Sequence, residues 1–283
     1  MFLSGNQVLN KNINNILLIF GRRINFETNE TVFALCKVHN KKIASWKNSF
    51  LRRVLADGII VLSGGLFMRD FPIFTTEYGV SSLILKEIPY KEEAYIRIRD
   101  VQEAFFQEHL AECVSFCRIC GAERIYAEGS PLLEGYPLYT AVYEMRGTAH
   151  SDPEKMACLF PVTEGTVGKW RTIYNESMRG VDNAGTLESR EEKQILESGG
   201  AYFVHREGDL LGIFWLEGTK LLAVSAVQKG AGETVMHTMM SLIPEEPMCL
   251  EVASTNKRAI GLYERLHFVK TRELSRWYRV YGE

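Results

Sequence analysis

The stretch LEVASTNKRAIGLYERLHF (residues 250–268) begins with the pattern of a buried strand and ends with that of an amphipathic helix. The polar turn ASTN (253–256) lies between them, and Glu251 and Tyr263 stand on either side of this turn. A carboxylate can accept a proton and a phenol can donate one, so both side chains suit acid–base chemistry. The stretch therefore predicts a strand, a turn and a helix that carry a candidate base and a candidate acid.

An earlier part of the chain repeats the order of elements that leads into this stretch. A strand, a helix and a second strand are predicted at 220–227, 232–243 and 248–254 in the second half, and at 94–101, 102–121 and 124–130 in the first. Ile96 lies 128 residues before Val224 (224 − 96 = 128), and Ile125 lies 125 before Leu250 (250 − 125 = 125). We interpret this pattern as an internal duplication. It predicts an α/β fold of the α+β type, with two mixed-sheet domains whose helices cover the sheet faces.

A polar, turn-rich segment, GTAHSDPEK (147–155), separates the two halves and predicts domains at 1–150 and 151–283. Further elements are expected in the second domain: a strand at 157–163, helices at 168–178 and 189–196, a hairpin at 201–218 that turns at 207–209, and two short strands at 268–282. The helix at 189–196 begins with Ser189 and the Ser-x-x-Glu pattern of a capping box.

The composition, with 46% hydrophobic and 24% charged residues, is that of a soluble globular protein. A net charge of −2 gives no electrostatic reason to expect binding to nucleic acid or to an anionic membrane. No stretch reaches the roughly 18 apolar residues of a membrane span. The apolar run NILLIF (15–20) also lacks the cleavage site of a secretory signal. Six cysteines are too few for a disulfide scaffold, so reduced thiols and a cytoplasmic location are expected.

The segment CVSFCRIC (113–120) has a C-x-x-x-C-x-x-C spacing that can hold an iron–sulfur cluster. A cluster requires a loop that brings three sulfurs to one point. Here the cysteines instead continue a single apolar helical stripe, formed by Phe106, Leu110, Cys113, Cys117 and Cys120. Cysteine in such a stripe behaves as a small buried hydrophobe. We therefore predict core packing and no metal site.

The loop VQKGAGET (227–234) follows one predicted strand and opens the next predicted helix. Gly230 and Gly232 allow a tight turn that exposes backbone N–H groups at the start of that helix. Unpaired amides and the helix dipole both favour a phosphate or diphosphate at such a position. A simple tight turn is the alternative explanation of this loop.

This loop is followed by a helix, a strand and the pattern N-x-x-A-x-x-L-Y-x-x-x-x-F (256–268), and the combination resembles the GNAT superfamily of acyl-CoA-dependent N-acetyltransferases. The residues that match the last pattern are Asn256, Ala259, Leu262, Tyr263 and Phe268. The likeness covers 157–283 in element order and 222–268 in motif. LEV followed by this Asn and Tyr is especially similar to the ribosomal-protein alanine acetyltransferases. His267 stands where the family usually has glycine.

The resemblance implies a GNAT-like fold for both domains and transfer of an acetyl group from acetyl-CoA to an amine. It implies Glu251 as base and Tyr263 as acid, and we expect Glu251 to be partly buried. The backbone amide near Val227 would polarise the thioester carbonyl. The residues that it assigns to coenzyme binding are Val224, Ala226, Val227, Gln228, Lys229, Gly230, Ala231, Gly232, Glu233, Thr234 and Asn256. In the first half, VQEAFF (101–106) has no glycine, so that half is expected to be a degenerate copy that walls the acceptor site.

Several alternatives remain open from the sequence. Glu251 could pair with a nearby Lys or Arg, Tyr263 could be a core residue, and Asn256 could only cap its helix. His205 and Glu217 are reserve bases. A non-catalytic acyl-CoA-binding or scaffold protein is the alternative function. The acceptor could be a small-molecule or peptide amine, and the protein could be a monomer or a homodimer. Aromatic residues that could line an acceptor pocket or belong to the core are Trp170, Tyr174, Trp215 and Trp277.

Overall fold

The fold is known from a computed structural model, which describes residues 16–19, 22–25 and 71–283. The first two strands, β1 (Ile16–Ile19) and β2 (Arg22–Asn25), pair antiparallel as a hairpin. Cys36, the ends of the apolar run 15–20 and most of the first 70 residues lie outside the described part of the chain.

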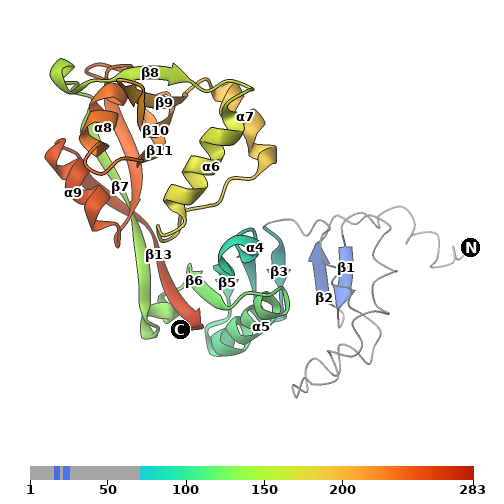
Figure 1. The fold of residues 1–283 in the computed structure, drawn as a ribbon. Coiled ribbons are helices and arrows are strands. Elements are labelled where there is room, and N and C mark those ends of the chain that lie inside the picture. The colour runs from blue at the N-terminus through green and yellow to red at the C-terminus, as the bar shows by residue number, and fades with distance from the viewer. Residues whose placement is uncertain (1–15, 20–21, 26–70) are drawn as a thin grey trace, which may run out of the picture. The chain divides into compact units, whose positions relative to one another are not determined.

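Residue contacts divide the chain into two compact units, each of which contains strands and helices (Figure 1). Unit 1 comprises residues 1–137 together with 278–283, and unit 2 comprises residues 138–277. Strand β13 (Val269–Tyr281) therefore begins in unit 2 and ends in unit 1. The prediction of an α/β fold with mixed sheets and helices on their faces is confirmed. The domain boundary at residue 150 stays a prediction.

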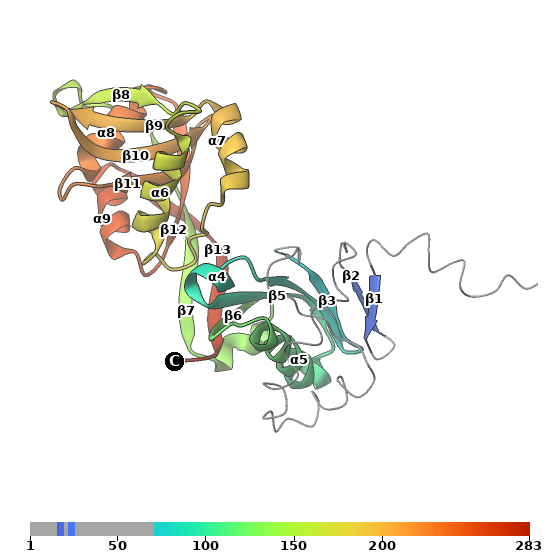
Figure 2. The ribbon, with the colours of Figure 1, turned by 45° about the vertical axis from the view of Figure 1, so that its right-hand side comes forward.

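Unit 1 is built around two parallel strands, β5 and β6, which helix α5 connects. Its strands follow the order β3-β4-β5-β6, and the last residues of β13 pair with β6. Besides the β1–β2 hairpin, its described elements are β3 (Ile73–Thr75), β4 (Gly79–Ile84), α4 (Ile88–Lys91), β5 (Glu93–Val101), η2 (Glu103–Phe105), α5 (Phe106–Ile119), β6 (Arg124–Glu128) and η3 (Pro131–Gly135). The predicted strand–helix–strand order is therefore present, with α5 against the strands (Figure 2).

The apolar stripe of α5 forms the core of unit 1 together with β5 and β6. Phe106, Leu110, Cys113 and Cys117 are all buried, which confirms their predicted place in the core. Burial raises the pKa of the Cys113 thiol to about 12, so this thiol stays neutral and unreactive at ordinary pH. In the described part of the chain, no three potential metal-ligating side chains are gathered at one point.

A polar network lies inside this core. The fully buried ring of His109 on α5 has Nδ1 2.8 Å from Thr76 Oγ1 and Nε2 2.7 Å from Ser81 Oγ. A neutral imidazole needs one donor and one acceptor, and two hydroxyl groups can supply both. Burial lowers the pKa of His109. The network therefore stabilises the neutral ring.

The stability of unit 1 should consequently fall as the pH drops below about 6.5, the ordinary pKa of histidine. His109 takes up a proton at that pH in the unfolded chain, but only at lower pH in the folded one, because its folded pKa is lowered. Urea unfolding at pH 7.5 and 5.5, followed by far-UV circular dichroism, should give a smaller pH dependence for His109→Gln than for the wild type. Equal pH dependence in both proteins would contradict this assignment.

Unit 2 contains a mixed sheet in the order β13-β7-β12-β11-β10-β9-β8. Strands β11 and β12 are parallel, and β12–β7, β10–β11, β9–β10 and β8–β9 are antiparallel. Its elements are β7 (Leu138–Thr148), η4 (Pro153–Lys155), β8 (Cys158–Pro161), α6 (Val167–Met178), η5 (Ser189–Glu191), α7 (Glu192–Ser198), β9 (Ala201–Arg206), β10 (Asp209–Glu217), β11 (Lys220–Ala226), α8 (Gly232–Met240), β12 (Pro247–Ala253) and α9 (Lys257–Arg265).

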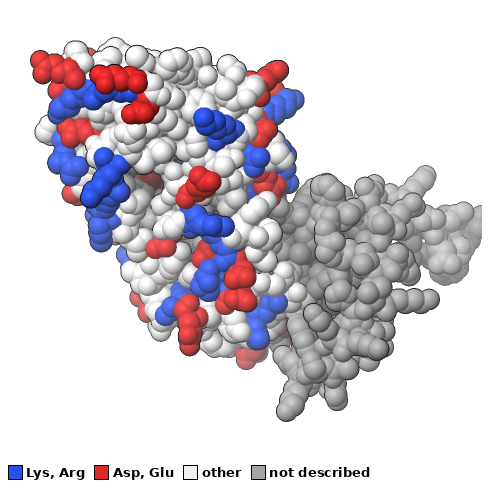
Figure 3. Space-filling model, viewed as in Figure 1, with Lys and Arg blue, Asp and Glu red and all other residues white. Residues whose placement is uncertain are grey.

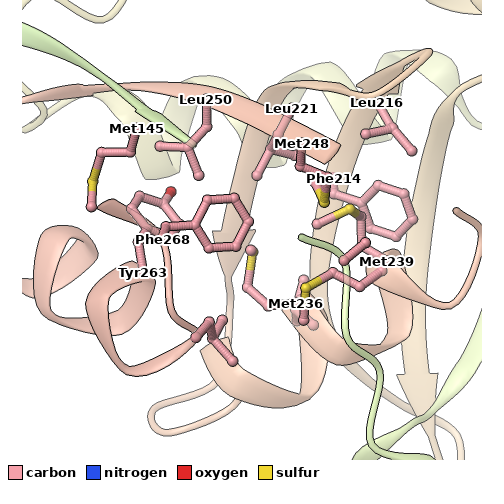
Figure 4. Close-up of a cluster of buried hydrophobic side chains, with 14 of the residues drawn as sticks. Met145, Phe214, Leu216, Leu221, Met236, Met239, Met248, Leu250, Tyr263 and Phe268 are labelled. Carbon is pink, nitrogen blue, oxygen red and sulfur yellow. The ribbon is translucent and has the colours of Figure 1, made fainter. Parts of the chain in front are cut away.

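Two helix pairs cover opposite faces of this sheet (Figure 1). Helices α8 and α9 pack on one face, where Phe214 of β10 points, and α6 and α7 pack on the other, where Trp215 points. This alternation follows from the two-residue period of a strand. The α8–α9 face is rich in methionine and also holds Tyr263 and Phe268 (Figure 4).

Two local predictions for the second half are wrong. The segment after α9 forms one strand of 13 residues, β13, in place of two short strands. It contains no Gly or Pro that would interrupt it. The capping box before α7 uses Glu188 as N-cap, not Ser189, and Glu191 Oε2 accepts the Glu188 N–H at 2.8 Å. Strands β3, β4 and β7 are not among the predicted elements.

The surface carries both signs of charge. On the face shown in Figure 3, Lys and Arg side chains lie among Asp and Glu, and neither sign gathers into a large patch. No described helix combines the length and the apolar character needed to cross a bilayer.

Candidate functional site

The parallel strands β11 and β12 pair over only two positions. Lys220 is paired with Cys249 and Leu221 with Leu250, and within the described sheet no later residue of β11 has a partner on β12. On its other side β12 continues to pair with β7 through residues 251–253. Strand β11 likewise continues to pair with β10 as far as Ala226, so the two parallel strands separate from each other close to where the loop 227–234 begins.

A bulge in β11 marks the position where this pairing stops. Trp215 of β10 lies opposite Ala223, whereas Leu216 lies opposite Leu221, so Leu222 is an extra residue. A bulge bends its strand and increases the local twist. It thereby accounts for the departure of β11 from β12.

The backbone amides at the end of β11 are divided between its two sides. The N–H groups of Val227 and Gln228 both donate to the carbonyl oxygen of Leu211 on β10, at 2.9 and 3.3 Å. The sheet already uses the Val227 amide, and the role of a backbone amide near Val227 stays a prediction. Alternate residues of a strand bond to opposite neighbours. The amides of Val224 and Ala226 accordingly point to the side where β12 has separated.

The start of α8 leaves backbone donors open. Gly230 has φ +89°, a left-handed conformation that favours glycine, and Ala231 at the N-cap provides no side-chain acceptor. Among the described residues, no hydrogen-bond acceptor is joined to the N–H groups of residues 229–230 and 232–234. These donors and the helix dipole together suit an anion.

Gly232 permits the start of α8 to lie against α9. A Cβ atom at this position would be 3.2 Å from Leu262 Cδ2 and 3.9 Å from Ala226 Cβ. The first of these separations is tighter than ordinary van der Waals contact, so a side chain at this position would require Leu262 to shift by a few tenths of an ångström. The two predicted glycines thus have different roles, Gly230 in the turn and Gly232 in packing.

Tyr263 of α9 lies inside the apolar cluster on the α8–α9 face. Only 6% of the residue is exposed, and its hydroxyl points toward Leu250 of β12 (Figure 4). No hydrogen bond to this hydroxyl is found within the described residues. Burial raises the pKa of Tyr263 to about 12. The side chain is therefore a protonated donor at neutral pH, with unused hydrogen-bonding capacity.

Glu251 is more exposed than the sequence suggested. Its side chain is 48% exposed, and Oε1 accepts a hydrogen bond from Lys220 Nζ at 2.7 Å, so the expectation of partial burial is wrong. The reason is that α6 and α7 cover β9, β10 and β11 but no residue of β12. The pairing alternative raised for Glu251 is correct. Its backbone position is the first of β12 beyond the last pair with β11.

Glu251 and Tyr263 are not in contact and lie on opposite faces of β12. Leu250 points into the cluster that contains Tyr263, and the next residue of a strand points to the other face. Both side chains nevertheless lie at the level where β11 leaves β12. A reacting group bound where the two strands separate could therefore be approached by Tyr263 from one face of the sheet and by Glu251 from the other.

Asn256 caps helix α9, as one of the two sequence interpretations expected. Its Oδ1 accepts a hydrogen bond from the Ala259 N–H at 3.1 Å. The alternative bases lie elsewhere in the sheet. His205 on β9 contacts the ring of Phe160, and Glu217 ends β10 at the turn that leads into β11.

The candidate pocket aromatics are mainly core residues. Trp170, Trp215 and Trp277 are buried, and the rings of Trp170 and Trp215 meet edge to face at 6.2 Å. Tyr174 stacks on Trp170 and donates its hydroxyl hydrogen to the Gly185 carbonyl oxygen at 3.1 Å. Of the two interpretations, the structure supports core packing.

Unit 1 has the same element order but no equivalent interruption between its parallel strands. Strands β5 and β6 pair from Glu93–Arg124 to Arg97–Glu128 without a break. The segment after β5 leads through η2 into α5 without a glycine. The two features that define the site in unit 2 are thus missing from the described part of unit 1.

Sequence reasoning missed three charged or polar partners of Glu233, the second residue of α8. Lys155 of η4 donates to Glu233 Oε1 at 2.6 Å, and His237 Nε2 lies 3.8 Å from the same oxygen. The hydrogen bond from Lys155 is the main cause that lowers the pKa of Glu233, and His237 and Arg265 add to it. Lys155 is 78 positions from Glu233, so no local pattern could have indicated the pair.

No protein-family model and no curated protein matches the chain. Solved structures similar to it include a GCN5-related N-acetyltransferase from Sphaerobacter thermophilus, with TM-score 0.49 and 12% identity over 86% of this chain and 90% of that one. A GNAT-family acetyltransferase from Colwellia psychrerythraea has TM-score 0.41 and 10% identity over 74% and 84%. A tandem GNAT protein from the clavulanic acid biosynthesis pathway has 0.42 and 10% over 75% and 83%. Because these TM-scores lie below 0.5, the function proposed below depends on this chain's own residues.

Proposed function

We propose that unit 2 is an acyl-CoA-dependent N-acyltransferase that moves an acetyl group from acetyl-CoA to an amine. The proposal depends on one arrangement. Strand β11 separates from β12 beside the start of α8, where backbone N–H groups are open. Tyr263 and Glu251 lie on opposite faces of β12 close to this separation. A diphosphate bound at the amides would place the rest of the coenzyme along the unpaired edge of β11. No protein side chain occupies those amides in the described structure.

The chemistry requires that an amine nitrogen bonds to the acyl carbon as the carbon–sulfur bond breaks and the sulfur leaves with the bonding electrons. Tyr263 can then donate its hydroxyl proton to the sulfur and regain a proton from water. Glu251, directly or through water, can accept the proton that the amine loses. The amides of Val224 and Ala226 supply donors for negative charge on the acyl oxygen. The acceptor itself is a small-molecule or peptide amine.

The first test is binding of CoA measured by calorimetry. We expect the wild type to bind CoA and Gly230→Val to bind it about tenfold or more weakly. The reason is that a β-branched residue at φ +89° forces the loop into another conformation, at a cost on the order of 1–3 kcal/mol. Inability of the wild type to bind CoA would contradict the proposed function.

The matched control is Gly218→Val. Gly218 also has a positive φ, +57°, and open space around a built Cβ, but it lies in the turn before β11, away from the loop. This variant carries a similar backbone strain and should keep the CoA affinity of the wild type. If both variants lost affinity equally, the effect would come from general strain and not from the loop.

One observation favours a second function, that of a non-catalytic acyl-CoA-binding protein. Lys220 already neutralises Glu251, and within the described residues no other carboxylate of β12 is available at the level of the break. The two functions are separated by thiol release from acetyl-CoA in the presence of a panel of amines. An enzyme releases CoA only with a suitable amine, whereas a binding protein releases none with any.

A further inference from the structure

Three groups from separate segments surround the carboxylate of Glu233 at the start of α8. Lys155 comes from η4 and forms the 2.6 Å ion pair, and Arg265 at the end of α9 adds a second positive charge to its surroundings. Lys155 and Glu233 are both partly exposed, at 47% and 41% of their side chains. The pair is therefore accessible to an incoming ligand.

His237 provides independent evidence that the hydrogen bonding around Glu233 is incomplete. Its Nδ1 accepts the Asp152 N–H at 3.2 Å, so the neutral ring carries its hydrogen on Nε2. Among the described residues, Nε2 is the one side-chain nitrogen or oxygen that is both shielded from solvent and without a hydrogen-bond partner. The side chain is nine-tenths buried, and Nε2 lies one helical turn from Glu233, 3.8 Å from Oε1. The buried Nε2–H donor thus lies just beyond hydrogen-bond distance of the Glu233 carboxylate, which already accepts a hydrogen bond from Lys155.

Glu233 also presents an electrostatic conflict with the open amides. A carboxylate in the first turn of a helix interacts well with the dipole, but it repels any phosphate that approaches the same N–H groups. Its bond to Lys155 also withholds this cation from such a phosphate. The second problem disappears if Lys155 moves to the phosphate, and a hydrogen bond from another donor then keeps the carboxylate partnered.

We propose that Lys155 exchanges partners, from Glu233 in the free protein to the diphosphate of the bound coenzyme, while His237 Nε2–H becomes the hydrogen-bond donor to Glu233. This inference rests on the proposed function, since it concerns the same helix start. It assigns Lys155 as a coenzyme-binding residue and Glu233 as a built-in competitor for it. His237 is a positioning residue that acts through Glu233.

The exchange predicts that substitutions of the two members of this ion pair change the affinity for CoA in opposite directions. Lys155→Gln removes a charge-assisted bond to the diphosphate, and we expect about tenfold weaker binding of CoA. Glu233→Gln removes the competing anion and frees Lys155, and we expect about two- to fivefold tighter binding. If the pair were only structural, both substitutions would break it and would change affinity in the same direction.

The substitution His237→Asn tests the roles of the two ring nitrogens separately. The asparagine oxygen can still accept the Asp152 N–H, but the donor toward Glu233 is lost. We expect about two- to fivefold weaker binding of CoA with an unchanged melting temperature. The double variant Glu233→Gln, His237→Asn should bind as tightly as Glu233→Gln alone, because no carboxylate remains to be held.

The experiment is calorimetric titration of the full chain and these variants with CoA and with pantetheine, which has no phosphate. All changes should appear with CoA and none with pantetheine. Lys193→Gln is the control, since Lys193 forms a similar exposed pair with Glu197 in α7. Weaker or unchanged CoA binding by Glu233→Gln, or unchanged binding by Lys155→Gln, overturns the inference while leaving the proposed function intact. A wild type that does not bind CoA overturns both.

Discussion

Replacement of Tyr263 by Phe is expected to lower turnover about 10²–10⁴-fold while the Kd for CoA stays unchanged. The substitution removes one hydroxyl from an apolar site and preserves the ring that packs against Phe268. A leaving thiolate would then depart without a proton donor. Steady-state thiol release with the best amine, combined with calorimetry, separates the loss of turnover from any loss of binding.

The hydroxyl of Tyr263 should not limit turnover at high pH. Because burial raises its pKa to about 12, it remains a donor through pH 10. Tyr202→Phe is the matched control, since Tyr202 packs against the same apolar cluster from β9. Glu251→Gln, which keeps a partner for Lys220, tests the base in the same assay. Near-native turnover of both Tyr263→Phe and Glu251→Gln would contradict the acid–base assignment.

Phe268→Ala is expected to destabilise unit 2 by about 3–5 kcal/mol. Phe268 is 1% exposed and fills the α8–α9 cluster, where its ring lies against the backbone of Gly147. Removing the ring leaves a cavity between β7 and α9 that neighbouring residues fill only in part. Urea unfolding followed by tryptophan fluorescence measures the loss, because Trp170, Trp215 and Trp277 all lie in unit 2.

The control for this substitution is Phe160→Ala. Phe160 lies on the edge strand β8 and is 52% exposed, so its replacement should change the free energy of unfolding by about 0.5 kcal/mol or less. A small effect of Phe268→Ala, similar to that of the control, would show that α9 does not depend on this packing. The proposed coenzyme site would then not depend on the packing of Phe268.

Local signals predicted the parts of the fold and site that local chemistry determines. The helix α9 begins where Asn256 supplies a cap, and α8 begins after the glycine turn at Gly230. The hairpin turns at Glu207 and Gly208, which both have positive φ. His267, in place of the usual glycine, also adopts a positive φ of +65°. In each case one residue and its immediate neighbours fix the backbone.

Features that depend on distant partners could not be predicted. The exposure of Glu251 follows from which strands α6 and α7 cover, and a single strand pattern contains no such information. The bulge at Leu222 appears only when β11 is aligned with β10. Lys155 approaches Glu233 because the segment after β7 packs on α8, where Thr238 Oγ1 accepts the Ala157 N–H at 3.0 Å. These contacts are set by tertiary packing.

The path of β13 affects the order in which the chain can fold during its synthesis. Unit 1 includes Tyr278 and Arg279, which pair with β6, although its main segment ends at residue 137, and 141 positions separate that residue from 278 (278 − 137 = 141). A ribosome needs roughly 7–30 s for that distance at about 5–20 residues per second. The part of the protein made first is therefore completed last, and until then the nascent chain carries an unpaired strand edge on β6 that a chaperone would have to shield.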